Sequence, residues 1–137
     1  MALVLIVDDD VSFRFFLKAL FETEGHKTLV CRNAAEALDR LSSASPDLIT
    51  LDVMMPGKGG LEMYRALCAG ETWKDIPVIM LSAVKAGTYA HALAISGVTG
   101  AELPAPYAYV EKPPKPELLL ELALPILGQA DERRRAV

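Results

Sequence analysis

Runs of apolar residues alternate along the chain with patterns of helical period. Leu3–Val7 is continuously aliphatic, as in a strand buried on both faces. Phe13, Phe16, Leu17, Leu20 and Phe21 follow at the spacing of one helical stripe. These patterns predict strands at residues 3–7, 28–31, 47–51, 76–81 and 107–110. They predict helices from Asp10 or Ser12 to Gly25, and at residues 34–41, 61–69, 85–96 and 116–127.

Strands that alternate with helices indicate an α/β fold with a parallel sheet and right-handed crossovers. We therefore expect a doubly wound (βα)₅ domain over residues 1–128, with a C-terminal tail at residues 129–137. Gly97–Pro106 holds two Gly and two Pro and is interpreted as a loop. Pro125 is expected to kink or end the last helix.

Composition and charge narrow the class of protein. The net charge of −4 disfavours direct nucleic-acid binding, because phosphate contacts need clustered Lys and Arg. Cys31 and Cys68 form no CxxC pair, and no apolar run approaches the roughly 20 residues that span a bilayer. A reduced, cytoplasmic protein without membrane insertion is expected.

Polar residues follow four of the predicted strands and should meet at one sheet edge. They are Asp8–Asp10, Asp52, Ser82 and Lys112. Each alone has a simpler explanation, such as a helix cap or a turn, but their joint placement does not. Clustered carboxylates repel one another, and a hard divalent cation such as Mg²⁺ relieves that repulsion. A metal, a carboxylate and a lysine suit a phosphoryl group, which the carboxylate can attack to form an aspartyl phosphate.

With these motifs, the sequence resembles the receiver domain of two-component response regulators, from about Leu3 to Leu127. The resemblance implies a flavodoxin-like five-stranded sheet of order 2-1-3-4-5. It rests on Leu5-Ile-Val-Asp-Asp-Asp10, Leu51-Asp-Val-Met-Met-Pro56 with Gly60, Leu81-Ser-Ala83 and Glu111-Lys-Pro113.

The resemblance also implies roles for individual residues. Asp52 corresponds to the phosphoacceptor, and Asp8 and Asp9 to the acidic pair that holds Mg²⁺. Met54 corresponds to the residue whose backbone carbonyl completes the metal shell. Ser82 matches the switch hydroxyl, Lys112 the phosphate-binding lysine before a cis proline, and Tyr109 the aromatic that changes rotamer on activation.

The sequence departs from the family pattern in three ways that matter, and the expected break of the last helix at Pro125 is one of them. Gly59 stands where the family often has Asp, and the stretch from Ser82 to Lys112 is several residues longer than usual. Leu120, Leu124 and Leu127 form a second apolar stripe on the last helix, apart from the stripe expected to face the sheet. We expect this second stripe to contact a target protein or a second copy, on the face that the family uses for output.

The function expected from the sequence is a phosphorylation-activated switch that catalyses its own phosphorylation and dephosphorylation. Its phosphodonor would be a sensor histidine kinase or a phosphotransfer protein. A single-domain regulator is favoured over a receiver excised from a larger hybrid kinase or transcription regulator. A Mg²⁺-dependent aspartyl-phosphate phosphatase is disfavoured, since Met54 stands where such enzymes need a second Asp. A flavodoxin-like cofactor protein would need a hydroxyl- and Gly-rich loop instead of Asp8–Asp10.

Overall fold

A computed structural model describes residues 1–53, 59–83 and 104–135 of the chain. The strands are β1 (Leu3–Val7), β2 (Lys27–Cys31), β3 (Leu48–Asp52), β4 (Val78–Ser82) and β5 (Ala108–Glu111). The helices in these ranges are α1 (Val11–Thr23), α2 (Ala34–Leu41), α3 (Gly60–Ala69) and α5 (Pro116–Arg135). The expected helix at 85–96 and most of Gly97–Pro106 lie outside the described residues.

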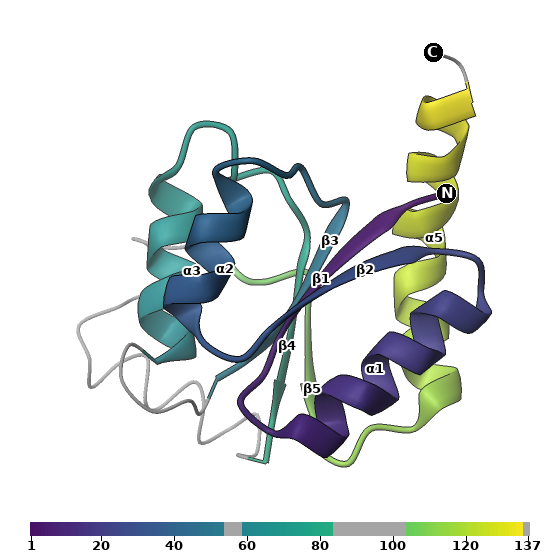
Figure 1. Ribbon diagram of the computed structural model, residues 1–137, viewed down its shortest axis with the longest axis horizontal. Coiled ribbons are helices and arrows are strands. Elements are labelled where there is room, and N and C mark those ends of the chain that lie inside the picture. The colour runs from purple at the N-terminus through teal and green to yellow at the C-terminus, as the bar shows by residue number, and fades with distance from the viewer. Residues whose placement is uncertain (54–58, 84–103, 136–137) are drawn as a thin grey trace.

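The five strands form one parallel sheet in the order β2-β1-β3-β4-β5, which confirms the expected doubly wound topology. Helices α1 and α5 cover one face of the sheet, and α2 and α3 cover the other (Figure 1). Strands β2 and β3, which are consecutive in the chain, lie on opposite sides of β1. The sheet therefore has a topological switch point between β1 and β3.

Alternating strand residues feed two separate hydrophobic cores. Leu5, Leu51 and Met80 belong to the core that includes α2 and α3 residues such as Leu41 and Met63. The intervening strand residues belong to the core that includes α1 and α5. They are Val4, Ile6, Ile79 and Leu81. Burial on both faces explains why these strands are continuous apolar runs in the sequence.

Side-chain caps set the starts of the first two helices. The carboxylate of Asp10 accepts a hydrogen bond from Phe13 N at 3.1 Å, and Asn33 accepts one from Glu36 N at 2.8 Å. After α1 the chain turns through Gly25 at φ 89°, a conformation that glycine adopts without steric cost. These caps and this stop agree with the boundaries expected from the sequence.

The prediction that the last helix ends near residue 127 is wrong. Helix α5 continues through Pro125 to Arg135, so most of the expected tail is helical. Residues beyond the proline supply core contacts, because Leu127 and Ala130 are both buried. A proline removes one backbone donor from a helix. Near that gap, the Tyr107 hydroxyl donates to the Leu122 carbonyl at 2.7 Å.

Across the described ranges, none of the helices has the length and apolar character needed to cross a membrane.

Candidate functional site

Strand register brings the predicted site residues to the carboxyl edge of the sheet. Val7 pairs with Leu51, so Asp8, which directly follows β1, lies at the same level as Asp52, which ends β3. Ser82 ends β4 opposite Glu111 of β5, and its carbonyl accepts a hydrogen bond from Lys112 N at 2.8 Å. The site therefore lies beside the switch point, as expected for an open parallel sheet.

Three carboxylates converge at this edge. One oxygen from each of Asp8, Asp9 and Asp52 lies within 4.8 Å of the others. Asp8 is fully buried and Asp52 is 5% exposed, whereas Asp9 lies at the surface. Two of the three acids are therefore buried, and the third is accessible to solvent.

Lys112, which is 104 positions from Asp8 in the sequence, contacts two of these carboxylates. Its Nζ lies 2.6 Å from Asp8 Oδ2 and 3.5 Å from Asp52 Oδ2. The Lys112–Pro113 peptide bond is cis, as the resemblance implied. An ammonium between two buried carboxylates offsets part of their repulsion.

The donor set fits a hard divalent cation. The cluster contains three carboxylates and one ammonium, so its net charge is −2 when all of these groups are ionised. Oxygen-only ligands favour Mg²⁺ over softer metals. Met54, the expected backbone ligand, lies outside the described residues.

Ser82 and Tyr109 are linked next to the site. Ser82 is fully buried, and the partly buried Tyr109 ring packs against the core on the α2–α3 side. Burial raises the pKa of the Tyr109 phenol, and a side-chain hydrogen bond with Ser82 opposes that rise. The phenol of Tyr109 therefore lies within hydrogen-bond reach of the Ser82 hydroxyl.

Three further residues contact the site, and of these the sequence analysis placed only Asp10 at this edge of the sheet. Arg14 donates to the Asp8 carbonyl at 2.8 Å, and Asp10 N donates to Asp8 Oδ1 at 2.9 Å. The Phe13 ring lies 4.2 Å from Lys112 Nζ, measured to its centroid. The helical pattern placed Phe13 in the core stripe, and spacing alone does not show that its ring also meets an ammonium 99 residues away.

The expected leucine stripe on α5 is only partly exposed. Leu127 is 2% exposed and belongs to the core, so its assignment to an outward face is wrong. Leu124 is 66% exposed, and Leu120 is partly buried. Leu127 follows the buried Ala123 by four residues, and residues at i and i+4 share a helix face. Leu127 therefore lies on the face that packs against the sheet.

The stripe also faces a different neighbour from the one expected. Leu120 and Leu124 line a hollow together with Glu24 and His26, which lie at the turn between α1 and β2. The side of α5 next to β5 instead carries the Leu122 carbonyl that Tyr107 contacts.

Curated relatives of this chain are longer regulators. The chain is 40% identical over 80 residues to the phosphate regulon transcriptional regulatory protein PhoB of Pseudomonas aeruginosa, covering 58% of this chain and 35% of the relative. It is 34% identical over 117 residues to the DNA-binding response regulator MtrA of Mycobacterium tuberculosis, covering 85% and 46%. The chain therefore spans less than half the length of these relatives.

Solved structures of similar size share the fold. The chemotaxis protein CheY4 of Vibrio cholerae aligns with a TM-score of 0.76 at 28% identity, over 92% of this chain and 98% of that one. The receiver domain of a signal transduction histidine kinase from Syntrophus aciditrophicus aligns with a TM-score of 0.79 at 28% identity, over 94% and 92%.

A family model for the response regulator receiver domain matches residues 4–123, which span all five strands and the acidic cluster. This match, the strand order and the edge cluster lead to the same conclusion: the chain belongs to the response regulator receiver domains of two-component signalling, whose general function is that of a phosphorylation switch.

Proposed function

We propose that this chain is a phosphorylation-activated signalling switch that accepts a phosphoryl group on Asp52 from a sensor histidine kinase or a phosphotransfer protein. The observation that carries the proposal is the position of Lys112 Nζ between Asp8 and Asp52, inside a cluster of three carboxylates. Asp52 is preferred as acceptor because it ends the central strand β3 and faces both Lys112 and the other two carboxylates of the cluster.

In the proposed reaction an Asp52 carboxylate oxygen attacks phosphorus, and the phosphorus–nitrogen bond of the donor phosphohistidine breaks. The electron pair of that bond stays on the imidazole nitrogen. Asp8, Asp9 and Asp52 would hold Mg²⁺, which would neutralise charge on the phosphoryl oxygens. Lys112 supplies a second positive charge to the same oxygens from the β5 side.

Ser82 is proposed to relay the change to Tyr109. A hydroxyl has one donor and two acceptor sites. When Asp52 is phosphorylated, Ser82 would turn its single proton from Tyr109 to a phosphoryl oxygen and would accept from the Tyr109 phenol instead. The existing contact between Ser82 and Tyr109 supports this path.

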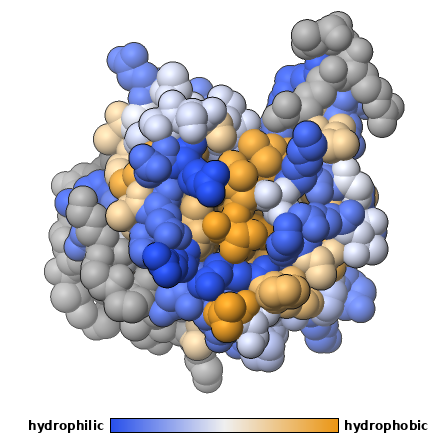
Figure 2. All heavy atoms as spheres, in the orientation of Figure 1, coloured by the Kyte–Doolittle hydropathy of each residue, from blue (hydrophilic) through white to orange (hydrophobic). Residues whose placement is uncertain are grey.

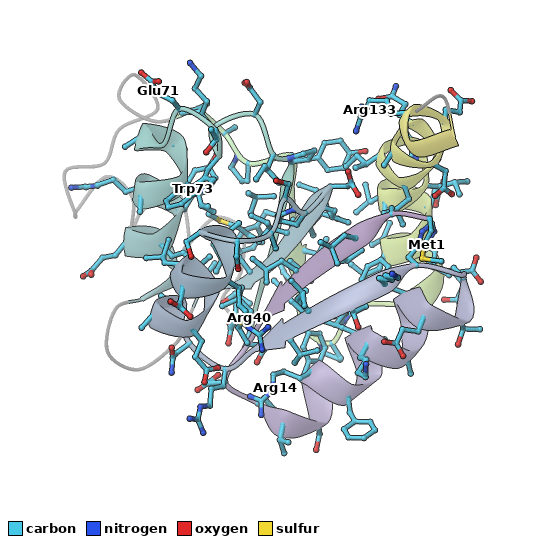
Figure 3. The ribbon with its side chains drawn as sticks, turned by 45° about the horizontal axis from the view of Figure 1, so that its top comes forward. Met1, Arg14, Arg40, Glu71, Trp73 and Arg133 are labelled. Carbon is cyan, nitrogen blue, oxygen red and sulfur yellow. The ribbon has the colours of Figure 1, made fainter. Side chains whose placement is uncertain are left out.

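The surface beside the acidic cluster suits a docked phosphodonor. Val11 and Phe15, at the start of α1, are 62% and 72% exposed. They share a hollow with Leu29 and Val30 of the edge strand β2, and Arg14 and Arg40 flank it (Figure 3). Figure 2 shows the resulting apolar patch surrounded by hydrophilic side chains. A phosphodonor seated there would lie two residues along the chain from Asp9.

We further propose that Leu120 and Leu124 contact a target protein or a second copy. Leu124 is exposed, and acidic side chains border the leucines. They are Glu24, Glu117 and Glu121. An apolar strip edged by carboxylates favours a partner with an apolar stripe and basic flanks. This surface differs from the β5 side of α5 that the family resemblance suggested.

We also propose that the protein is a single-domain response regulator and that it binds no nucleic acid directly. The net charge of −4 and the match to nearly the full length of a chemotaxis protein support it. The alternative is one domain of a longer regulator, which the lengths of the curated relatives favour. An immunoblot of the natural protein separates the two, because a DNA-binding regulator would run well above 14.8 kDa.

The function is tested by phosphorylation with acetyl phosphate and Mg²⁺. We expect one base-labile adduct of phosphoryl mass on the wild-type chain and none on Asp52→Asn. Asp9→Asn serves as the matched control, since it removes a metal ligand but leaves the acceptor, and should slow the reaction without moving the adduct. An adduct that persists on Asp52→Asn would overturn the assignment.

A further inference from the structure

The ammonium of Lys112 has an aromatic neighbour as well as two acidic ones. Its Nζ lies 4.2 Å from the centroid of the Phe13 ring, and its side chain is only 18% exposed. A cation over a ring face is attracted by the ring quadrupole, and the attraction grows as water is excluded. The lysine is thus held from the β5 side by its backbone and from the α1 side by a ring.

The position of that ring is set by the same residues that shape the acidic cluster. Asp10 caps α1 by accepting from Phe13 N at 3.1 Å, and Asp10 N donates to Asp8 Oδ1 at 2.9 Å. Asp8 Oδ2 in turn accepts from Lys112 at 2.6 Å. Asp8, Asp10, Phe13 and Lys112 therefore form a closed ring of contacts around the helix start.

We propose that Phe13 is a positioning residue for Lys112 in phosphoryl transfer, a role that rests on the proposed function. A lysine carries its charge on a flexible four-carbon stem, so an unsupported ammonium samples many positions. The ring restricts it to the space between Asp8 and Asp52. The ring contact itself uses no carboxylate oxygen as a hydrogen-bond acceptor.

The first test compares phosphorylation rates with acetyl phosphate at saturating Mg²⁺. Phe13→Leu should react roughly two- to fivefold more slowly, the range expected from an exposed to partly desolvated cation–ring contact. Phe13→Tyr keeps the ring face and should recover the rate. Phe16→Leu is the matched control, because Phe16 lies 5.6 Å from Phe13 on the same helix and packs against the same core. Its rate should stay within the error of the wild type.

A double-mutant cycle separates positioning from a general loss of packing. In a Lys112→Ala background, Phe13→Leu should cause no further slowing, because the ring has no ammonium left to hold. An equal slowing in both backgrounds would show that Phe13 acts on the fold alone and would overturn the proposal.

A spectroscopic measurement tests the contact without phosphorylation. The Lys112 methylene protons next to the ammonium should show upfield ring-current shifts in the wild type and in Phe13→Tyr, and lose them in Phe13→Leu. Unshifted protons in the wild type would overturn the contact. A wild-type chain that takes up no phosphoryl group would overturn the proposed function together with this role. A phosphorylated wild type that reacts no faster than Phe13→Leu would overturn this role alone.

Discussion

Gly60 lies directly against the backbone of Asp52, at the point where α3 returns to the end of β3. Gly60 N donates to the Val53 carbonyl at 3.0 Å. A methyl group added at Gly60 would overlap the Asp52 carbonyl and lie 2.6 Å from Val53 Cα. The glycine therefore allows the close approach that positions the proposed acceptor.

Gly60→Ala should lower the free energy of unfolding by about 1–3 kcal/mol, the usual range for overpacking. It should also slow phosphorylation, because the Asp52 backbone must move. Gly128→Ala is the control: no atom lies within 4 Å of the added carbon, and an alanine in the middle of α5 should stabilise the fold by about 1 kcal/mol. Urea unfolding measures both, and equal stabilities for the two variants would contradict the close-packing argument.

Mg²⁺ affinity should fall as the pH is lowered toward the ionisation range of carboxyl groups. Ligating carboxylates must be ionised, so protons compete with the metal for Asp8, Asp9 and Asp52. Isothermal titration at several pH values measures the effect. A double variant Asp9→Ala, Asp52→Asn that kept wild-type affinity would remove the site from consideration.

Ser82→Ala should still accept a phosphoryl group but respond weakly to it. The alanine removes the hydroxyl that we place between Asp52 and the Tyr109 phenol. Backbone amide shifts, recorded with and without phosphodonor, report the response. Tyr109→Phe is the companion variant, because it removes the same contact from the other side. Wild-type shifts in Ser82→Ala would rule out the relay.

Neighbouring leucines of α5 should respond differently to a charge. Leu124→Glu should leave the chain folded, since that side chain is 66% exposed, but weaken self-association or partner binding. Leu127→Glu should unfold the domain, because it buries an unpaired charge at a residue that is 2% exposed. Circular dichroism and sedimentation with and without phosphodonor separate the two. A folded Leu124→Glu variant with unchanged assembly and partner binding would contradict the proposal that Leu120 and Leu124 form a contact surface.

The two cysteines should differ in reactivity toward iodoacetamide. Burial raises the pKa of the Cys31 thiol to about 11, and it also raises the pKa of Cys68. A raised pKa leaves less thiolate at pH 8, so both should react more slowly than an unfolded thiol. Cys31 is 2% exposed and should be the slower of the two in native protein. Mass spectrometry after timed labelling measures both rates. A Cys31 that reacted faster than Cys68 would contradict its burial.

Much of this architecture is predictable because β1, β3 and β4 are buried, largely aliphatic runs, and a polar residue ends or directly follows each of them. That pattern predicts that Asp8, Asp52, Ser82 and Lys112 meet at one edge of the sheet. The extent of α5 was predicted incorrectly because Pro125 has a strong local preference, whereas the burial of Leu127 and Ala130 is a tertiary effect. The contact of Phe13 with Lys112 was missed for a similar reason, since a residue in a core stripe gives no sign of what its exposed edge meets.

The contact between Asp8 and Lys112 also bears on when the chain becomes competent during folding. The two residues are separated by 104 positions, and β5 joins the sheet only through β4. Closing so long a loop is entropically costly and belongs to the slow, non-local part of folding. A nascent chain with β1 to β4 already paired carries the proposed acceptor but lacks the lysine that faces it. The proposed phosphoryl transfer would therefore reach its full rate only once the last strand has docked, so the rate of phosphoryl uptake would report completed folding.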